Sequence, residues 1–278
     1  MRVVLAEHAG FCMGVRRAVE TTLDLLEKQQ EPLATYGPLI HNPQVLEMLA
    51  GKGVKVLDEI PAQAEGTVVI RAHGVPPAGK ARLEASGARV EDATCPRVLK
   101  VQAIIGRYQR EGYTTVIVGD RDHAEVVGLM GYAGDSGRVV SSSAEVDNLQ
   151  LADAPYIIVS QTTQDEETFA AITEAILARW PGGKVFNTIC DSTHKRQDEV
   201  RRMCREVDAL VVVGGRNSAN TKRLAEIAEN LQCPVFLVET EAELAADAMR
   251  GYQTVGVTAG ASTPAWIIRQ VVSALEAI

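Results

Sequence analysis

Three cysteines with unusual neighbours carry the strongest chemical signal in this chain of 278 residues. Cys12, Cys95 and Cys190 lie in Ala-Gly-Phe-Cys-Met-Gly, Asp-Ala-Thr-Cys-Pro and Asn-Thr-Ile-Cys-Asp-Ser-Thr, about one in each third of the sequence. Their Gly, Pro and Thr neighbours favour loops. The Cys-x-x-Cys pairs of a structural zinc knuckle are absent. If the three thiolates converge, they leave one coordination position of a metal open to a substrate, which is typical of a catalytic centre.

The spacing of these thiols leaves the identity of the metal open. Three cysteines with a water or a histidine suit zinc, whereas thiolates with no obvious histidine beside them favour an iron–sulfur cluster. Cysteine is also often a small buried apolar residue. That is the interpretation for Cys204, in a helical Arg-Arg-Met-Cys-Arg-Glu, and for Cys233, which precedes an apolar strand. For the other three cysteines, metal binding and simple burial both remain open at this point.

Polar and reactive side chains follow the ends of predicted strands. The six strand candidates span residues 3–6, 68–72, 115–119, 156–160, 209–214 and 254–258. His73 and His123 come shortly after two of them, and His41 follows a strand-like Tyr-Gly-Pro-Leu-Ile. Parallel sheets bind ligands at the carboxyl ends of their strands, and helix N-termini at that edge suit anions. A single histidine is more often a structural hydrogen-bonding residue than a ligand, but three at strand ends point to a site.

Hydroxyl, amide and carboxyl groups occupy similar positions. Ser218, Asn220, Ser262 and Thr162 lie in turns that open helices, where they either cradle an anion or simply cap the helix. Glu125 is either an ordinary first-turn residue favoured by the helix dipole or a general acid whose pKa is raised by burial. Neither a Walker loop nor a Gly-x-Gly-x-x-Gly fingerprint is present, which disfavours ATP and NAD.

The elements that must position these residues alternate between strands and helices. Helical patterns span residues 15–27, 42–52, 77–86, 97–111, 165–179, 193–206, 220–230 and 264–278. Strands that alternate with helices of this length predict an α/β protein with parallel sheets. With two strand ends and one cysteine per third, we expect three similar α/β lobes around a shared centre. Their approximate bounds are 1–95, with the N-terminal strand near the centre, 96–192 and 193–278.

Composition narrows the class of protein. Hydrophobic residues make up 46% and charged residues 23%, and the formal net charge is −8, so a nucleic-acid surface is not expected. We also expect no membrane span and no signal peptide, and therefore a cytoplasmic protein. An anionic substrate would gain little from the overall field of this chain. It would need local donors such as imidazoles, hydroxyls and amides.

Nine segments, taken together, resemble the LytB-type 4-hydroxy-3-methylbut-2-enyl diphosphate reductases. They are Ala-Gly-Phe-Cys-Met-Gly-Val-Arg-Arg-Ala-Val (9–19), Gly-Pro-Leu-Ile-His-Asn-Pro (37–43), Arg-Ala-His-Gly-Val-Pro-Pro (71–77), Asp-Ala-Thr-Cys-Pro (92–96), His-Ala-Glu-Val-Val-Gly (123–128), Gln-Thr-Thr-Gln (161–164), Thr-Ile-Cys-Asp-Ser-Thr (188–193), Gly-Gly-Arg-Asn-Ser-Ala-Asn-Thr-Lys-Arg-Leu (214–224) and Ala-Gly-Ala-Ser-Thr-Pro (259–264). The segments run in the same order along the whole chain.

The resemblance implies a fold, a cofactor and a set of roles. The fold is a trefoil of three α/β lobes, with mainly parallel sheets around a central cavity that holds an iron–sulfur cluster. Cys12, Cys95 and Cys190 are implied to hold one [4Fe–4S] cluster with one open iron. The remaining implied residues are Glu125 as proton donor, Thr162 as a substrate-orienting and proton-relaying hydroxyl, and His41, His73, His123, Ser218, Asn220 and Ser262 as diphosphate ligands.

The implied activity is an oxidoreductase step, the last of the methylerythritol phosphate route to isoprenoids. An allylic diphosphate, (E)-4-hydroxy-3-methylbut-2-enyl diphosphate, would lose its hydroxyl and give isopentenyl and dimethylallyl diphosphates. The implied electron donor is a ferredoxin or a flavodoxin. Two other hypotheses stay open from the residues alone. One is a zinc hydrolase with a three-cysteine site and Glu125 as general base, and the other is a non-catalytic iron–sulfur sensor of an anionic metabolite.

Overall fold

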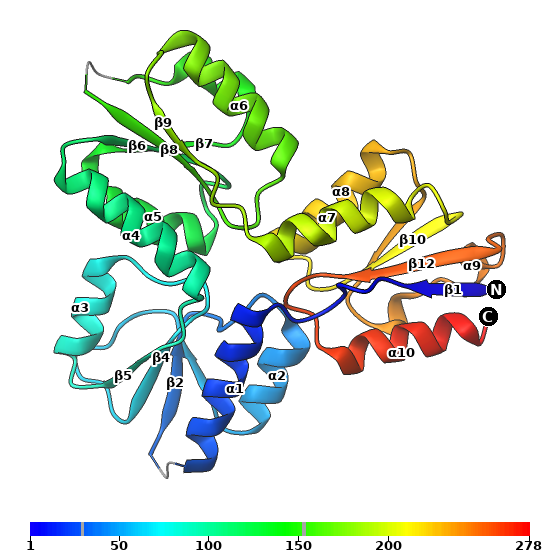
Figure 1. Ribbon diagram of the computed structural model, residues 1–278. Helices are drawn as coiled ribbons and strands as arrows, with labels where there is room; N and C mark the ends of the chain where they lie inside the picture. Colours follow the sequence, from blue (N-terminus) through cyan, green and yellow to red (C-terminus); the bar gives the residue numbers. More distant parts are fainter. Residues whose placement is uncertain (29–30, 152–153) are drawn as a thin grey trace. The chain divides into compact units, whose positions relative to one another are not determined.

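The strands form three separate four-stranded parallel sheets (Figure 1). The computed structural model describes residues 1–28, 31–151 and 154–278. The prediction of three α/β lobes with parallel sheets is confirmed. By its internal contacts the chain divides into two compact units. Unit 1 comprises Met1–Arg16, His41–Glu47 and Asp191–Ile278, and unit 2 comprises Arg17–Ile40 and Met48–Cys190.

Unit 1 contains one sheet with the strand order β1-β12-β10-β11. Its strands are β1 (Arg2–Leu5), β12 (Thr254–Ala259), β10 (Ala209–Val213) and β11 (Val235–Val238), and its main helices are α7 (Asp191–Met203), α8 (Ala219–Asn230) and α10 (Ala265–Glu276), with the short α9 (Ala246–Met249). All five residues of β10 are buried. Its side chains alternate between two apolar clusters, one shared with α10 and the other with α7 and α8. Helices therefore cover both faces of this sheet, as the continuous apolar sequence of β10 predicts.

The first strand joins the sheet of the last third of the chain. β1 pairs with β12 from Arg2↔Thr254 to Leu5↔Val257. The predicted first lobe, residues 1–95, included this strand, and the structure assigns it to the third sheet instead. The physical reason is that β12 has only one neighbour in its own third, β10, so that its other edge is free to take up the N-terminal strand.

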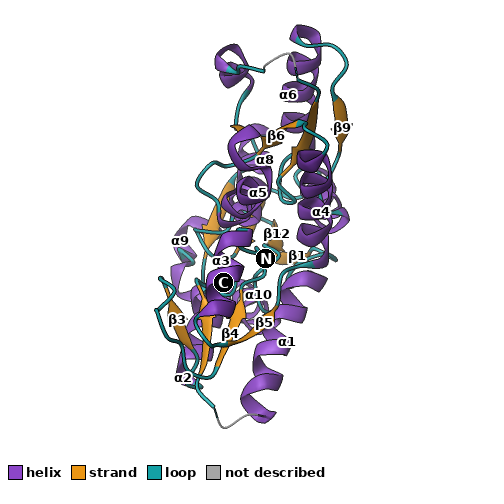
Figure 2. Ribbon diagram, turned by 90° about the vertical axis from the view of Figure 1, so that its left-hand side faces the viewer, coloured by secondary structure: helices purple, strands orange, loops and turns teal. Residues whose placement is uncertain are grey.

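Unit 2 contains the other two sheets, whose strand orders are β3-β2-β4-β5 and β7-β6-β8-β9. Figure 2 draws the strands in orange. The strands of the first sheet are β3 (Lys55–Leu57), β2 (Leu33–Tyr36), β4 (Thr67–Ile70) and β5 (Arg89–Asp92), and those of the second are β7 (Gly137–Val140), β6 (Thr114–Val118), β8 (Tyr156–Ser160) and β9 (Lys184–Phe186). Helices α3 (Pro77–Ala85), α4 (Pro96–Arg110), α5 (Ala124–Ala133) and α6 (Glu166–Arg179) lie wholly in this unit, whereas α1 (Met13–Lys28) and α2 (Pro43–Gly51) carry residues of both units.

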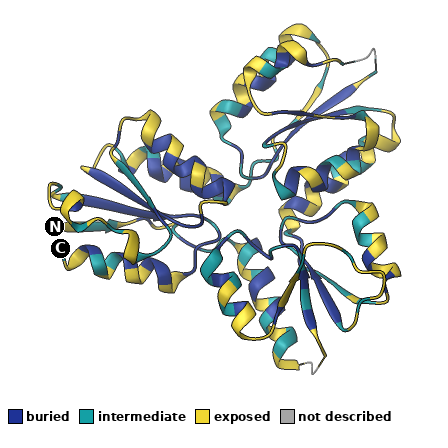
Figure 3. Ribbon diagram, turned by 180° about the vertical axis from the view of Figure 1, so that it is seen from behind, coloured by how far each residue is buried: buried dark blue, intermediate teal, exposed yellow. Residues whose placement is uncertain are grey.

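The central strands of each sheet are buried, and the outward faces of the helices are exposed (Figure 3). In the β7-β6-β8-β9 sheet, Val116 and Val118 pack with α6, whereas Ile117 faces α4 and α5. This alternation follows from the two-residue period of a strand. Packing of both faces fixes the orientation of each strand, and with it the point from which the following loop starts.

Helix α5 packs closely against the segment that leads into α3. A side-chain Cβ at Gly131 would lie 2.5 Å from the Cβ of Pro76, and one at Gly128 would lie 3.7 Å from the carbonyl oxygen of His73. Glycine at both positions therefore allows the two backbones to approach. The start of α5 is held next to the loop after β4 as a result.

All six predicted strands and all eight predicted helices are present within one to three residues of their expected bounds. The sequence pattern did not identify α5 as a full helix, and it left six further strands unassigned. Within residues 1–28, 31–151 and 154–278, no helix combines the length and the apolar character needed to cross a bilayer.

Candidate functional site

Of the six predicted site residues of unit 2, all but Glu125, which lies in α5, are in loops that follow a strand. His73 follows β4, Cys95 follows β5, His123 follows β6, Thr162 follows β8 and Cys190 follows β9. In each sheet the strands are parallel, so these loops emerge at the same edge of their sheet. This edge is where open α/β sheets bind ligands.

Glu125 and Thr162 form the most tightly bonded pair of this unit. Both are buried, with 2% and 6% of their surfaces exposed. The backbone N–H of Thr162 donates to Oε1 of Glu125 at 2.7 Å, and its hydroxyl donates to Oε2 at 2.7 Å. A buried carboxyl group that touches a hydroxyl in this way has the geometry of a proton donor with a relay partner.

His123 is the N-cap of α5 and bonds the backbone of the residue that carries the carboxyl group, Glu125. Its Nδ1 accepts a hydrogen bond from the backbone N–H of Glu125 at 3.2 Å. With Nδ1 as acceptor, the remaining ring nitrogen, Nε2, is the one that can donate to a ligand. The first-turn position expected for Glu125 is confirmed, since it is the second residue of α5 and is buried, and its role as an acid stays a prediction.

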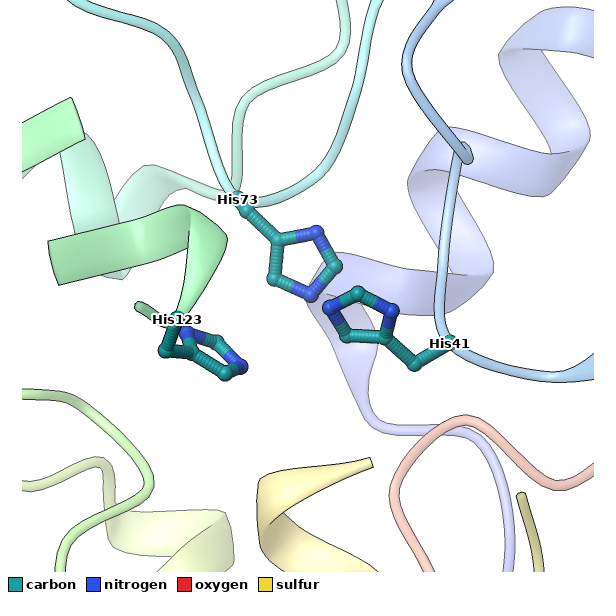
Figure 4. Close-up of side chains that lie close together, drawn as sticks. All are labelled: His41, His73 and His123. Atoms are coloured by element: carbon teal, nitrogen blue, oxygen red, sulfur yellow. The ribbon is translucent and has the colours of Figure 1, made fainter. Parts of the chain in front are cut away.

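The rings of His73 and His123 lie edge to face, with centroids 5.3 Å apart and planes at 81° (Figure 4). His73 is carried by the loop after β4, and His123 by the loop after β6. The structure therefore brings together two predicted ligand residues from different sheets of unit 2. Figure 4 also draws His41, which lies in unit 1 on the loop before α2.

Cys190 is bonded to the same loop that carries the hydroxyl. Its backbone N–H donates to the carbonyl oxygen of Thr162 at 2.9 Å. Two residues earlier, Thr188 exchanges hydrogen bonds with Ser160: its hydroxyl accepts from the backbone N–H of Ser160 at 2.8 Å and donates to the carbonyl oxygen at 2.6 Å. The backbone of Cys190 is thus hydrogen-bonded to Thr162, whose own N–H and hydroxyl bond the carboxyl group of Glu125.

Cys95 stands directly before α4, whose first residue is Pro96. Its backbone N–H donates to the carbonyl oxygen of Ala72, next to His73, at 2.9 Å. The guanidinium group of Arg17 donates to the carbonyl oxygen of Thr94 at 3.0 Å. A charged side chain from α1 therefore fixes the loop of this cysteine, although nothing in the local sequence around Cys95 indicates it.

Asp92 adds a second support to the same loop. Its carboxylate accepts the backbone N–H of Thr94 at 3.0 Å and forms an ion pair with Lys80 at 2.9 Å. Burial opposes the charge of this group, but hydrogen bonds from Thr94 and Lys80 outweigh it and lower the pKa of Asp92 below its ordinary value of 3.8. The group is consequently ionised at neutral pH.

Unit 1 gathers the hydroxyl and amide residues of the prediction. Ser218 is the N-cap of α8, and its hydroxyl oxygen accepts from the backbone N–H of Thr221 at 3.4 Å. The hydroxyl of Ser262 donates to the carbonyl oxygen of His41 at 3.0 Å and lies 3.5 Å from that of Ser218. The N-cap interpretation of Ser218 is therefore correct, and a helix N-terminus of this kind also favours an anion.

Asn220, in the first turn of α8, carries the clearest sign of an absent ligand in unit 1. Only 4% of its surface is exposed, and neither its amide nitrogen nor its amide oxygen has a hydrogen-bond partner within the described part of the chain. A buried amide without partners costs about 1–3 kcal/mol. Such a group fits a site that is completed by a polar substrate.

Cys12 lies on the same edge of unit 1 as Ser262. Its backbone N–H donates to the carbonyl oxygen of Ala261 at 3.1 Å. Gly10 has φ = 101°, a left-handed conformation that favours glycine, and it turns the chain just before the thiol. In unit 1, as in unit 2, a predicted metal ligand is thus hydrogen-bonded to a loop that carries a predicted substrate ligand.

The cysteines divide into two groups by their surroundings. All five lie in described residues and none forms a disulfide. Cys204 and Cys233 pack into the apolar cluster under α7 and α8, and burial, followed by the neighbouring Cys233, raises the pKa of Cys204 to about 12. Cys12, Cys95 and Cys190 lie instead in half-buried loops. Their soft donor set fits an iron–sulfur cluster, with zinc as the other metal that it would suit.

These features define a three-sheet parallel α/β protein that presents thiols and anion-binding groups at the carboxyl ends of its strands. The LytB protein family model matches residues 3–276, and the chain belongs to this family. It is similar to proteins named 4-hydroxy-3-methylbut-2-enyl diphosphate reductase. The Geobacter sulfurreducens protein is 46% identical, over 99% of this chain and 97% of that protein. The Aquifex aeolicus protein is 41% identical, over 99% and 96%.

Two solved structures share the fold. The structure of the E-1-hydroxy-2-methyl-but-2-enyl-4-diphosphate reductase from Plasmodium falciparum matches with a TM-score of 0.93 at 26% identity, over 98% of this chain and 87% of that one. A second, described as (E)-4-hydroxy-3-methyl-but-2-enyl diphosphate reductase, the terminal enzyme of the non-mevalonate pathway, matches with a TM-score of 0.72 at 40% identity over the whole of both chains.

Proposed function

We propose that this protein reduces (E)-4-hydroxy-3-methylbut-2-enyl diphosphate to isopentenyl and dimethylallyl diphosphates, the last step of the methylerythritol phosphate route. Its relatives of 41–46% identity over almost the whole chain are named for this reductase activity. The observation that carries the proposal is the buried Glu125–Thr162 pair, whose backbone also accepts the N–H of Cys190. A proton source hydrogen-bonded to the loop of a thiol ligand is what a reduction that consumes protons beside a metal requires.

Cys12 from unit 1 and Cys95 and Cys190 from unit 2 are the proposed ligands of one [4Fe–4S] cluster. When bound, such a cluster supplies electrons and one open iron that acts as a Lewis acid toward the allylic hydroxyl. The overall step balances as one substrate, two electrons and two protons giving one olefinic diphosphate and one water. The C–O bond breaks, and a C–H bond forms at the allyl group.

The side chains divide the remaining work between binding and proton transfer. His41, His73, His123, Ser218, Asn220 and Ser262 are the proposed ligands of the diphosphate. They supply imidazole, hydroxyl and amide donors to an anion in a chain whose net charge is −8. Holding the diphosphate fixes the allylic hydroxyl in place, which lowers the entropic part of the barrier.

Glu125 supplies the protons in this proposal, and Thr162 relays them and orients the substrate hydroxyl. The hydroxyl of Thr162 contacts Oε2 of Glu125 at 2.7 Å, so a proton can pass between them with little motion. Because both groups are buried, water competes poorly for the proton. His123 accepts the backbone N–H of Glu125 and so fixes the helix turn that carries this carboxyl group.

The electron donor that we propose is a ferredoxin or a flavodoxin, and we propose the cytoplasm as the location. Support comes from the type of reaction, which needs a low-potential donor. No nucleic-acid or membrane partner is proposed for this acidic chain.

Turnover by the anaerobically reduced protein tests the proposal. The protein is incubated with the allylic diphosphate and a chemical reductant, and the products are separated by liquid chromatography with mass detection. We expect both olefinic diphosphates and consumption of two electrons per product. Release of inorganic phosphate or of the free alcohol would instead identify a zinc hydrolase. Binding without any product would identify a sensor.

A further inference from the structure

Glu199, on α7, binds the beginning of the Cys12 loop, defined here as residues 7–12. Its Oε1 accepts the backbone N–H of Glu7 at 2.7 Å, and its Oε2 accepts the backbone N–H of His8 at 3.0 Å. The carboxylate is 5% exposed, and its nearest cation is Arg202, at 3.5 Å and mostly in solvent. Burying a carboxylate is costly unless its oxygens are hydrogen-bonded, and here both accept from the loop.

Arg196, one helical turn earlier, binds the middle of the same loop. One end of its guanidinium group, Nη2, donates to the carbonyl oxygen of Gly10. The other, Nη1, donates to the carbonyl oxygen of Ser192 at 2.8 Å, within the first turn of α7. Arg196 is 4% exposed. Residues three positions apart share one face of a helix, so Arg196 and Glu199 form a single polar patch directed at the loop.

The proposed binding of the cluster and the diphosphate does not by itself explain why these two charged side chains are buried here. Neither residue is among the proposed ligands of cluster or diphosphate, yet both are buried ions in contact with a segment almost 190 positions away in sequence. A well-packed apolar contact would hold two elements together at lower cost, since buried ions are poor sources of stability. What the two ions provide is a defined orientation of the backbone of the Cys12 loop. Three bonds fix three peptide groups of the loop, through the N–H groups of Glu7 and His8 and the carbonyl oxygen of Gly10.

We propose that Arg196 and Glu199 are positioning residues for the metal centre, which hold the Cys12 loop in the conformation in which its thiol ligates iron. This inference rests on the proposed function, because it assumes that Cys12 is a ligand. Helix α7 begins at Asp191, directly after Cys190, so one helix both continues from one proposed ligand and fixes the loop of another. Groups that orient a metal ligand typically affect metal affinity 10- to 100-fold when mutated.

The sharpest perturbation is Glu199→Gln. A carboxylate offers an acceptor oxygen to each of the two N–H groups, whereas the amide offers one oxygen and turns an N–H group toward the other donor. One of the two loop bonds must therefore break with almost no change in volume. Asp198→Asn is the matched control, since it makes a similar acid-to-amide change at the preceding position of α7. The Asp198 side chain is exposed and forms ion pairs with His194 and Arg201 of the same helix.

Two measurements test the proposal, and the first needs no iron. Amide hydrogen exchange of the iron-free protein is followed by mass spectrometry in a peptide that covers residues 6–12. Glu199→Gln should expose Glu7 and His8 and accelerate exchange in this peptide by at least about tenfold, while Asp198→Asn matches the parent. Exchange unchanged in Glu199→Gln would overturn the inference.

The second measurement is the rate at which a chelator removes iron from the anaerobically reconstituted protein. We expect about tenfold or faster loss from Glu199→Gln and from Arg196→Lys, whose ammonium group cannot bridge two carbonyl oxygens, and parent-like loss from Asp198→Asn. The electron paramagnetic resonance spectrum of the reduced cluster should change in the same two variants. If Glu199→Gln does not fold, Arg196→Lys carries the test alone.

The outcomes separate the two proposals. A parent protein that takes up no iron and sulfide contradicts the proposed function. A parent that holds the cluster, with both variants losing iron at the parent rate and showing its unchanged resonance, contradicts the positioning role and leaves the proposed function intact.

Discussion

Replacing Glu125 by glutamine separates proton donation from every other role of this side chain. The glutamine oxygen can still accept the backbone N–H of Thr162, and its amide can donate to the hydroxyl oxygen, so that both 2.7 Å contacts persist in outline. The substitution leaves the side-chain volume almost unchanged and at most weakens these two hydrogen bonds, each of which contributes about 0.5–1.5 kcal/mol. We therefore expect the free energy of unfolding to change by less than about 2 kcal/mol.

Turnover should respond far more strongly than stability. Loss of a positioned general acid costs about 10²- to 10⁴-fold in rate, so kcat of Glu125→Gln should fall by this factor while the protein still takes up iron and binds substrate. The assay is anaerobic single-turnover and steady-state reduction, with urea unfolding and iron content measured on the same preparation. Glu174→Gln, an exposed carboxylate on α6, is the control and should behave as the parent does. A folded, iron-loaded Glu125→Gln protein with full kcat would refute the role of this residue.

Three further predictions concern substrate binding, acid stability and thiol reactivity. Asn220→Leu removes a buried amide that has no partner among the described residues, so it should stabilise the substrate-free protein by about 1 kcal/mol. It should also weaken diphosphate binding at least about tenfold. Calorimetry that showed unchanged affinity would exclude a contact between Asn220 and the substrate. The pKa of Asp92 is lowered from 3.8, so the contribution of this carboxylate to stability is present above pH 4 and is lost as the pH falls below that value. The urea midpoint of Asp92→Asn should therefore fall less between pH 5 and pH 3 than that of the parent. Equal losses would contradict the direction of the pKa shift. The pKa of Cys204 is about 12, so its alkylation rate should still be rising with pH beyond pH 10, whereas a plateau near pH 9 would show an ordinary thiol.

Five of the six central strands could be predicted from sequence, all but β2, whereas most of the edge strands could not. Five of the six predicted strands lie in the middle of a sheet, where both faces are covered and the sequence is a continuous apolar run, as in β10. The edge strands Lys55–Leu57 and Arg89–Asp92 are short and carry charges, since one side of each has no neighbouring strand. Their strand character comes from pairing with β2 and β4, which a local pattern does not contain.

Helix α5 was missed for a different reason. Its sequence, Ala-Glu-Val-Val-Gly-Leu-Met-Gly-Tyr-Ala, is apolar almost throughout and contains two glycines, which lowers its helix propensity and blurs any amphipathic period. The glycines serve close packing against the segment of residues 73–76. Tertiary contact thus makes a helix of a segment whose local preference is weak.

The reactive residues of the site could be identified from sequence, but not the residues that hold them. Thiols, imidazoles and hydroxyls at strand ends form a pattern that motif and family resemblance can detect. Arg17, Arg196 and Glu199 lie in ordinary helical sequence and bind loops that are tens to hundreds of positions away. Long-range hydrogen bonds of this kind have no local signal, so only the fold reveals them.

The metal content of the protein tests the central claim most directly. The chain is purified and reconstituted without oxygen, and iron, zinc and acid-labile sulfide are measured per chain, with Cys95→Ser as the ligand variant and Cys233→Ser as the control. A [4Fe–4S] site predicts a brown protein with about four irons and four sulfides per chain, kept in Cys233→Ser and lost or reduced in Cys95→Ser. A colourless protein with one zinc and no sulfide would contradict the claim.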